Sequence, residues 1–225
     1  GLRVTALRGH DNEELPYHRE SQAIILQTPL PPGEETLVRL TYEGPIDEAV
    51  CFPDFTDEEF HDTRLRCFFR GYDSRFRHGR CFARVGDNYT LLFPECLWYP
   101  VAIPPVNVNT PLARQYDFTR YRLKVGNVGQ RVAISQGKMT TNGDTAIFTN
   151  HQPLPSLTLA IGTYEREAIV LDSLTLELYY FPGHDFFTRD YTCLKDSARL
   201  LLEDPVSQIR EIKGGDYPYR KFTPI

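Results

Sequence analysis

The sequence lacks the patterns that mark most enzymes and most membrane proteins. It contains no H-E-x-x-H zinc motif, no G-x-S-x-G nucleophile elbow and no phosphate-binding loop ending in G-K-[ST]. No apolar run approaches the roughly 18 to 20 residues that a membrane-spanning helix needs. No signal-peptide pattern is present, and Gly1 is interpreted as a cloning remnant, so flanking spans or signals could have been removed. No catalytic, cofactor-binding or metal-ligating residue can therefore be assigned from motifs.

Sulfur-containing residues are also scarce. There is one Met, and the five cysteines are Cys51, Cys67, Cys81, Cys96 and Cys193. Because none of them forms a C-x-x-C pair, a zinc ribbon or a redox motif is disfavoured. The odd count leaves at least one free thiol, and Cys67 and Cys81 are candidate partners across a hairpin. The 13 Tyr and 14 Phe favour β-sheet over a helix bundle.

Charge is arranged in blocks along the chain. The net charge of -5 predicts no overall attraction to nucleic acid or to an anionic membrane. Residues 43–62 carry acidic side chains and no Lys or Arg, whereas residues 64–84 hold seven arginines interleaved with aromatic rings. The first block could bind calcium but lacks the spacing of an EF-hand loop. The second resembles a nucleic-acid footprint. Adjacent blocks of opposite sign can face each other across a hairpin and cancel locally, which is the simpler interpretation. A protein or domain contact stays an alternative, and we expect no nucleic-acid partner.

Alternating apolar and polar residues predict a series of strands. The expected strands are 2–8, 21–28, 36–43, 88–93, 118–125, 130–135, 145–149, 157–162 and 173–181. Prolines and a glycine at 29–33 predict a turn, and Asn142-Gly143 within the polar segment 140–144 indicates a hairpin. We therefore expect a mainly β fold, an antiparallel β-sandwich.

The last 50 residues have a different character. Helical spacing predicts a helix over 188–202, and Asp204-Pro205 opens a second that ends at Gly214. An extended aromatic run then begins and stops at Ile225, which is typical of a segment cut from a larger protein. We expect a sandwich domain over 1–171 and, over 172–225, the truncated start of a further domain made of a strand and two helices.

Two places are candidates for functional contacts. His-Asp dipeptides occur at 10–11, 61–62 and 184–185, and a metal site would need three or four converging ligands. His184 and Asp185 are the candidates among them, because they lie at the predicted junction between strand and helix. Trp98 and Tyr99 could line a pocket with the Pro104–Pro111 loop, although the favoured interpretation of Trp98 is a core anchor. Cys96 and Ser135 could be nucleophiles, but nothing near them in sequence marks a partner base.

Several segments in the same order resemble the N-terminal part of the zinc aminopeptidases of the aminopeptidase N type. The first runs from Gln22 through the Pro29–Glu34 turn to Leu40–Gly44. The others are Phe118–Leu123 with Ala133–Gly137, Leu159–Tyr164, and 173–225 ending in Gly215–Tyr219. The Pro94–Pro100 stretch is similar to a bacterial subset of that family fused to ABC-transporter permease segments. Residues 45–90 fit the family poorly.

The resemblance implies a β-rich domain that packs against a thermolysin-like catalytic domain and helps to wall its substrate cavity. It implies that zinc and its ligands belong to the missing catalytic domain, so that this fragment is not an enzyme. The partners implied are that missing peptidase-like domain and a peptide substrate. A membrane would be reached only through absent flanking segments, and the parent would be a bacterial, membrane-associated protein.

Two alternative functions from other classes of protein stay open. The chain could be a cell-surface binding module of the β-sandwich type, for peptide or carbohydrate, because sandwich folds host many functions. It could also be an independent hydrolase that uses Cys96 or one of the His-Asp pairs.

Overall fold

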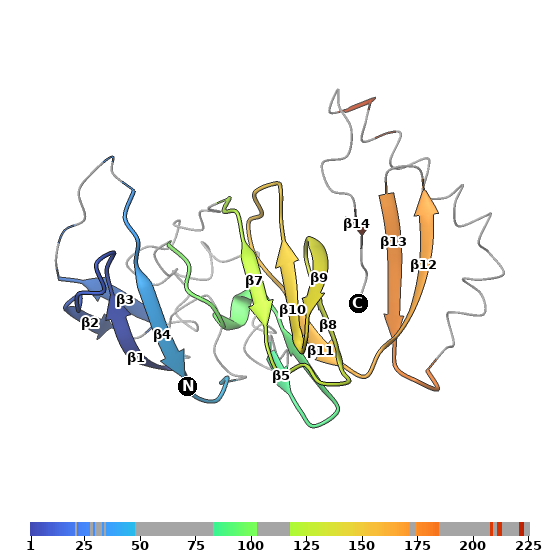
Figure 1. Cartoon of the computed structure of the whole chain (residues 1–225), viewed down its shortest axis with the longest axis horizontal. Coiled ribbons are helices and arrows are strands. Elements are labelled where there is room, and N and C mark those ends of the chain that lie inside the picture. Colours follow the sequence, from blue (N-terminus) through green and yellow to red (C-terminus); the bar gives the residue numbers. More distant parts are fainter. Residues whose placement is uncertain are drawn as a thin grey trace, which may run out of the picture. The chain divides into compact units, whose positions relative to one another are not determined.

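The computed structural model is mainly β and divides into two compact units. It describes residues 1–20, 22–27, 29, 33, 35–47, 83–102, 118–171, 174–184, 208, 211–212 and 221–222. The first unit comprises Gly1–Val85 and Leu91–Asp117, and the second comprises Gly86–Thr90 and Phe118–Ile225. Figure 1 labels the strands of both units except β6. No helix of the described part is long and apolar enough to cross a membrane.

The first unit contains two small antiparallel sheets. Strand β1 (Arg3–Arg8) pairs with β4 (Arg39–Glu43), and β2 (Tyr17–Glu20) pairs with β3 (Ala23–Leu26). The Arg19 guanidinium donates a hydrogen bond of 2.7 Å to the Leu2 carbonyl and so connects β2 to the chain beside β1. Leu7, at 3% exposure, is the buried residue of β1.

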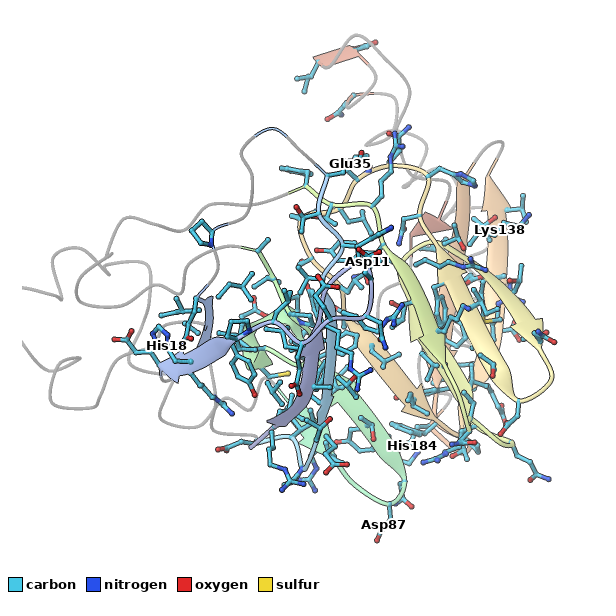
Figure 2. All side chains as sticks on the ribbon, turned by 60° about the vertical axis from the view of Figure 1, so that its left-hand side comes forward. Asp11, His18, Glu35, Asp87, Lys138 and His184 are labelled. Atoms are coloured by element: carbon cyan, nitrogen blue, oxygen red, sulfur yellow. The ribbon has the colours of Figure 1, made fainter. Side chains whose placement is uncertain are left out.

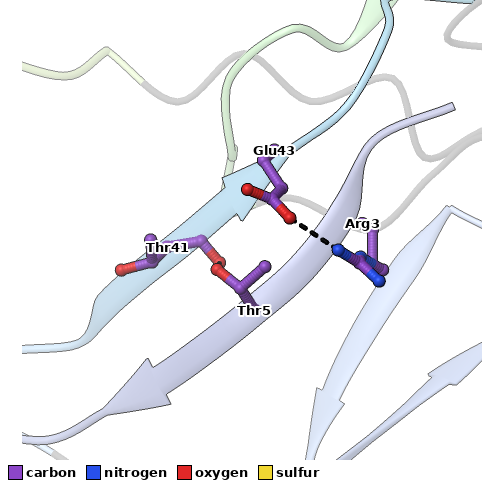
Figure 3. Close-up of polar contacts among 4 residues, drawn as sticks. All are labelled: Arg3, Thr5, Thr41 and Glu43. Carbon is purple, nitrogen blue, oxygen red and sulfur yellow. Dashed lines mark hydrogen bonds and ion pairs between the residues drawn. The ribbon is translucent and has the colours of Figure 1, made fainter.

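A β-bulge shapes the pairing of β1 with β4. The register shifts between Val4 and Ala6, so Thr5 has no direct partner residue. Instead the Thr5 hydroxyl donates to the Thr41 carbonyl at 3.2 Å, while Arg3 and Glu43 form an ion pair at 2.6 Å (Figure 3). Both charged side chains are more than half exposed, so this ion pair adds little to stability.

The second unit contains a three-stranded sheet in the order β7-β10-β9. Its strands are β7 (Arg122–Val125), β10 (Thr145–Thr149) and β9 (Lys138–Asn142), all antiparallel. Gly143, with φ of 57°, takes the first position of the two-residue turn between β9 and β10. Glycine at that position matches a type II′ hairpin. The Asn-Gly signal therefore marks the right hairpin, but β9 extends through Asn142.

A four-stranded sheet has the order β5-β6-β11-β8. Its members are β5 (Ala83–Val85), β6 (Tyr89–Leu92), β11 (Leu159–Gly162) and β8 (Val132–Ser135). Strands β8 and β11 lie behind β7, β10 and β9 in Figure 1. The corner at Gln136 and Gly137 leads directly from β8 into β9, that is, from one sheet to the other.

The core of the second unit is built from both of these sheets. Phe148 of β10 and Ile134 of β8 are the largest fully buried side chains, and Ala160 of β11 is completely buried. At the corner Gly137 has φ of 94°, and a Cβ there would come within 2.7 Å of the Thr149 carbonyl oxygen. Glycine is required at this position because any side chain would meet both backbone strain and the backbone of β10.

The third sheet of the unit combines antiparallel and parallel pairing. Strands β12 (Glu165–Leu171) and β13 (Leu174–Tyr180) form a hairpin paired along its whole length. Strand β14 (Lys221–Phe222) returns to pair in parallel with residues 175 and 176 of β13. Gln208, Glu211 and Ile212 have helical backbone within the second predicted helix. The first predicted helix, 188–202, lies outside the described residues.

The predicted fold class is confirmed: the chain is mainly β and consists largely of antiparallel sheets. Nine predicted strands have counterparts, most of them shorter by a few residues. Five strands of the described part were not predicted: β2, β5, β9, β12 and β14. The predicted domain boundary between 171 and 172 falls at the turn of the β12–β13 hairpin, and this boundary stays a prediction.

Candidate functional site

The first candidate place is the corner that holds Trp98. Pro94–Cys96 form a short 3₁₀ turn, η2, and Leu97 follows it in the left-handed conformation with φ of 52° and ψ of 43°. Its N–H donates to the Pro94 carbonyl at 3.1 Å. A left-handed conformation is strained for a residue with a branched side chain. The surrounding contacts therefore fix the direction in which the chain enters Trp98.

Trp98 lies inside the protein rather than on its surface. Trp98 is 8% exposed, and its ring contacts the Tyr99 ring edge-on at a centroid distance of 4.8 Å. The Tyr42 hydroxyl donates to the Trp98 carbonyl at 3.0 Å, and burial raises the pKa of Tyr42. The indole N–H is buried and has no hydrogen-bond partner among the residues that the structure describes. This geometry supports the interpretation of Trp98 as a core anchor, and the Pro104–Pro111 loop lies outside the described residues.

Cys96 is poorly suited to act as a nucleophile. It is 4% exposed, and its thiol donates to the Phe93 carbonyl at 3.0 Å. Burial raises the pKa of the Cys96 thiol to about 11. Because the thiolate is the reactive form, this group is protonated and inert near neutral pH. The other four cysteines, and with them the proposed Cys67–Cys81 pairing, fall outside the described residues.

The second candidate place is an aromatic cluster in the second unit. The Phe181 ring lies 5.3 Å from Tyr89, 4.8 Å from Tyr164 and 6.4 Å from His184. Gly162 permits this packing, because a Cβ there would approach the Tyr164 ring to 2.9 Å. Burial, followed by the nearby Tyr89, raises the pKa of Tyr164. His184 thus sits at the exposed rim of a packed cluster, while Asp185 lies outside the described residues.

A polar network on β12 and β13 was missed by sequence reasoning. Glu177 is 8% exposed and accepts hydrogen bonds from Arg166 at 2.7 Å and from the Tyr179 hydroxyl at 3.0 Å. The Glu177 carboxylate holds the pKa of Arg166 above its ordinary value through that hydrogen bond. A single acidic residue inside the apolar strand L-T-L-E-L-Y-Y was the available signal, because a buried carboxylate requires a partner.

The network predicts a pH dependence of stability. Burial raises the pKa of Tyr179 to about 12 from the ordinary 10.0, and Glu177 adds to the rise. The neutral phenol therefore stabilises the fold fully below about pH 10, and this contribution is lost as the pH rises through about 12. Between those values we expect the wild type to lose on the order of 2 kcal/mol more than Tyr179→Phe does.

Urea unfolding at about pH 9 and about pH 12 measures this difference. Tyr17→Phe, on the separate β2–β3 hairpin, is the matched control and should follow the wild type. An equal loss of stability in the wild type and in Tyr179→Phe would contradict the assignment.

Other ionisable side chains of the described residues do not converge on a reactive centre. Within the first unit, Asp11, His18 and Glu35 lie on separate segments of the chain (Figure 2). Ser135 is buried, and its hydroxyl donates to the Thr158 carbonyl at 2.8 Å. No three His, Cys, Asp or Glu side chains of the described ranges group in a way that could hold a metal ion. The described residues therefore do not fit a zinc site.

Comparison with known proteins places the fold. No protein-family model and no curated protein sequence matches the chain. Among solved structures, a two-domain M1 zinc metallopeptidase mutant bound to L-arginine matches with a TM-score of 0.60 and 20% identity, over 99% of this chain and 46% of that one. An M1 zinc metallopeptidase from Deinococcus radiodurans matches with a TM-score of 0.55 and 18% identity, over the same shares. A two-domain M1 zinc metallopeptidase mutant bound to L-tryptophan matches with a TM-score of 0.55 and 19% identity.

The chain thus spans less than half the length of the solved structures that it matches. At this level of identity the likeness concerns the fold alone. The protein shares the fold of part of the two-domain M1 zinc metallopeptidases along nearly its whole length.

Proposed function

We propose that the chain is the non-catalytic N-terminal part of an aminopeptidase of the M1 zinc metallopeptidase type. The observation that carries this proposal is the match over 99% of this chain to only 46% of a two-domain zinc metallopeptidase. A fragment that aligned with a catalytic domain would need a zinc-binding motif, and the sequence has no H-E-x-x-H. The fragment is therefore a scaffold, and hydrolysis belongs to the partner domain.

In this proposal the β-rich chain packs against the catalytic domain and helps to wall the substrate cavity. The mixed sheet β12-β13-β14 is the part of the chain that would join the two. Its strands β13 and β14 belong to the segment 172–225 that we assign to the start of the catalytic domain, whereas β12 precedes that segment. The substrate would be a peptide, from which the whole protein releases amino-terminal residues. The zinc would be held entirely by residues of the missing domain.

The parent is further proposed to be a bacterial, membrane-associated protein with ABC-transporter permease segments. This finer proposal is supported by the Pro94–Pro100 stretch, which resembles that subset of the family. In the structure the stretch forms the strained corner at Leu97 and the buried Trp98. A binding module with Trp98 exposed in a pocket is less well supported, since the ring is buried.

The reading frame of the parent gene tests this proposal directly. We expect H-E-x-x-H, followed by a downstream Glu, within about a hundred residues after Ile225. The two His of such a motif lie on one face of a helix and bind zinc, with the intervening Glu as general base. A parent that ends shortly after Ile225, or that continues without this motif, would overturn the assignment.

A further inference from the structure

Charge is strongly segregated within the second unit. Residues 118–164 hold five Arg or Lys and a single acidic residue, Asp144. The rest of the chain holds the other twenty Arg or Lys and the other twenty-nine acidic residues. Asp144 is already engaged, because its carboxylate accepts a hydrogen bond of 2.5 Å from the Gly129 amide. The net charge of -5 therefore conceals a cationic region on an acidic protein.

The cations of this region gather on one face of the β7-β10-β9 sheet. Directly paired residues point to the same side of a sheet, and two neighbouring rows face away from the core. One row is Arg122–Thr149–Lys138, and the other is Lys124–Ile147–Thr140. The opposite face carries the buried residues Val125, Ala146 and Phe148.

The outward face continues along the extended chain before β7. The Asn150 amide donates to the Tyr121 carbonyl at 3.3 Å, and residue 119 bridges to residue 154, so the alternation extends upstream. Arg120 then follows Arg122 on the same side, and Phe118, at 62% exposure, marks its rim. We call the surface with Arg120, Arg122, Lys124 and Lys138 the cationic face.

The cations of this face are uncompensated. All four are exposed, and no ion pair joins any of them to a carboxylate in the described part of the chain. Strand geometry places them within about 14 Å by 10 Å. Like charges at this spacing repel one another, and an anionic partner would relieve that repulsion.

We propose that the cationic face docks the protein onto an anionic lipid bilayer. The cations form a two-dimensional array across both outer strands of the sheet, which suits a planar anionic surface. An exposed aromatic residue at the rim suits the headgroup region of a bilayer. This proposal does not depend on the peptidase assignment.

Two other polyanions fit the face less well. An acidic peptide that added a strand would take its affinity from the backbone of one sheet edge, whereas these cations are spread over two strands and the face between them. Single-stranded nucleic acid stacks its bases on several aromatic rings. Among the described residues of the cationic face, Phe118 is the only exposed ring.

Vesicle sedimentation of the whole 225-residue chain tests the proposal. The two vesicle populations are phosphatidylcholine alone, and phosphatidylcholine with phosphatidylserine as the minor lipid. We expect binding only to the second population, with a loss of binding as salt shortens the screening length. The double variant Arg122→Gln/Lys138→Gln should weaken partitioning by about thirtyfold, from the typical contribution of each cation near a charged bilayer.

The matched control is Arg84→Gln/Arg131→Gln, which removes the same charge from exposed positions outside the cationic face. It should bind phosphatidylserine vesicles within about twofold of the wild type. Circular dichroism and thermal unfolding verify that both variants are folded. Equal binding to both lipid mixtures, equal losses in the two double variants, or binding to polyglutamate in place of vesicles would each overturn the proposal.

Discussion

Phe148→Ala will lower the free energy of unfolding by about 3–5 kcal/mol, as expected for truncating a fully buried Phe. Phe148 is 1% exposed and lies on the central strand β10, between β7 and β9. Its removal would leave a cavity between the two sheets that meet at the Gln136-Gly137 corner. Since small domains are stable by only about 5–15 kcal/mol, the second unit of this variant should be near its unfolding threshold at ordinary temperature.

Urea unfolding followed by circular dichroism measures the effect. Val170→Ala is the matched control, because it also shortens an apolar side chain in a strand but at 67% exposure. We expect the control to change stability by no more than about 0.5 kcal/mol. A cost below about 1 kcal/mol for Phe148→Ala would show that the core is not where the two sheets place it.

The strands that could be predicted contain apolar residues, either alternating with polar ones or in a short run. Thr145–Thr149, with the apolar run Ala-Ile-Phe, forms β10 with the predicted bounds, and the apolar segment Leu159–Gly162 lies within the prediction for 157–162. The ends of the strands were predicted less well, because the alternation of apolar and polar residues continues beyond the last hydrogen bond between the strands. At Phe118–Tyr121 the alternation is real, but only residue 119 has a bridge partner.

Two of the missed strands, β9 and β2, have sequences without an apolar periodicity. Strand β9 is exposed at all five positions, so its sequence K-M-T-T-N reads as part of a polar turn. Strand β2, with Y-H-R-E, is exposed at three of four positions. Such strands exist because an adjacent strand with more apolar residues supplies the hydrogen-bond ladder: β10 pairs with β9, and β3 pairs with β2.

The candidate contact residues, too, could be predicted from the sequence only in part. His184 could be placed at the end of a strand from the sequence, but its aromatic neighbours Tyr89 and Tyr164 come from distant segments. Trp98 was open to two readings, and only its burial favours the core anchor. The Arg166–Glu177–Tyr179 network depends on the register of β12 against β13, which periodicity alone does not determine.

Joining this chain to its missing domain is expected to have the largest effect on activity. Zinc-dependent peptidases activate a metal-bound water and commonly accelerate hydrolysis by many orders of magnitude. The described residues bring no three metal-ligating side chains together, and Cys96 is held as a buried thiol. The proposed assignment predicts that the complete parent hydrolyses peptide substrates and that the isolated chain contributes only binding surface.

The comparison needs matched preparations. The parent and residues 1–225 are purified in the same buffer, freed of metal with a chelator and then supplied with zinc. Circular dichroism verifies that the shorter protein is folded, and Phe148→Ala serves as the reference for lost structure. Zinc content per chain is measured alongside activity, which separates failure to bind the metal from failure to catalyse.

The decisive measurement is the rate of aminoacyl-anilide hydrolysis by these two preparations with and without zinc. The proposed assignment predicts zinc-dependent turnover by the parent, which the chelator abolishes, and no turnover above background by residues 1–225. Zinc-dependent turnover by residues 1–225 alone, or a zinc-loaded parent that hydrolyses no substrate, would contradict it.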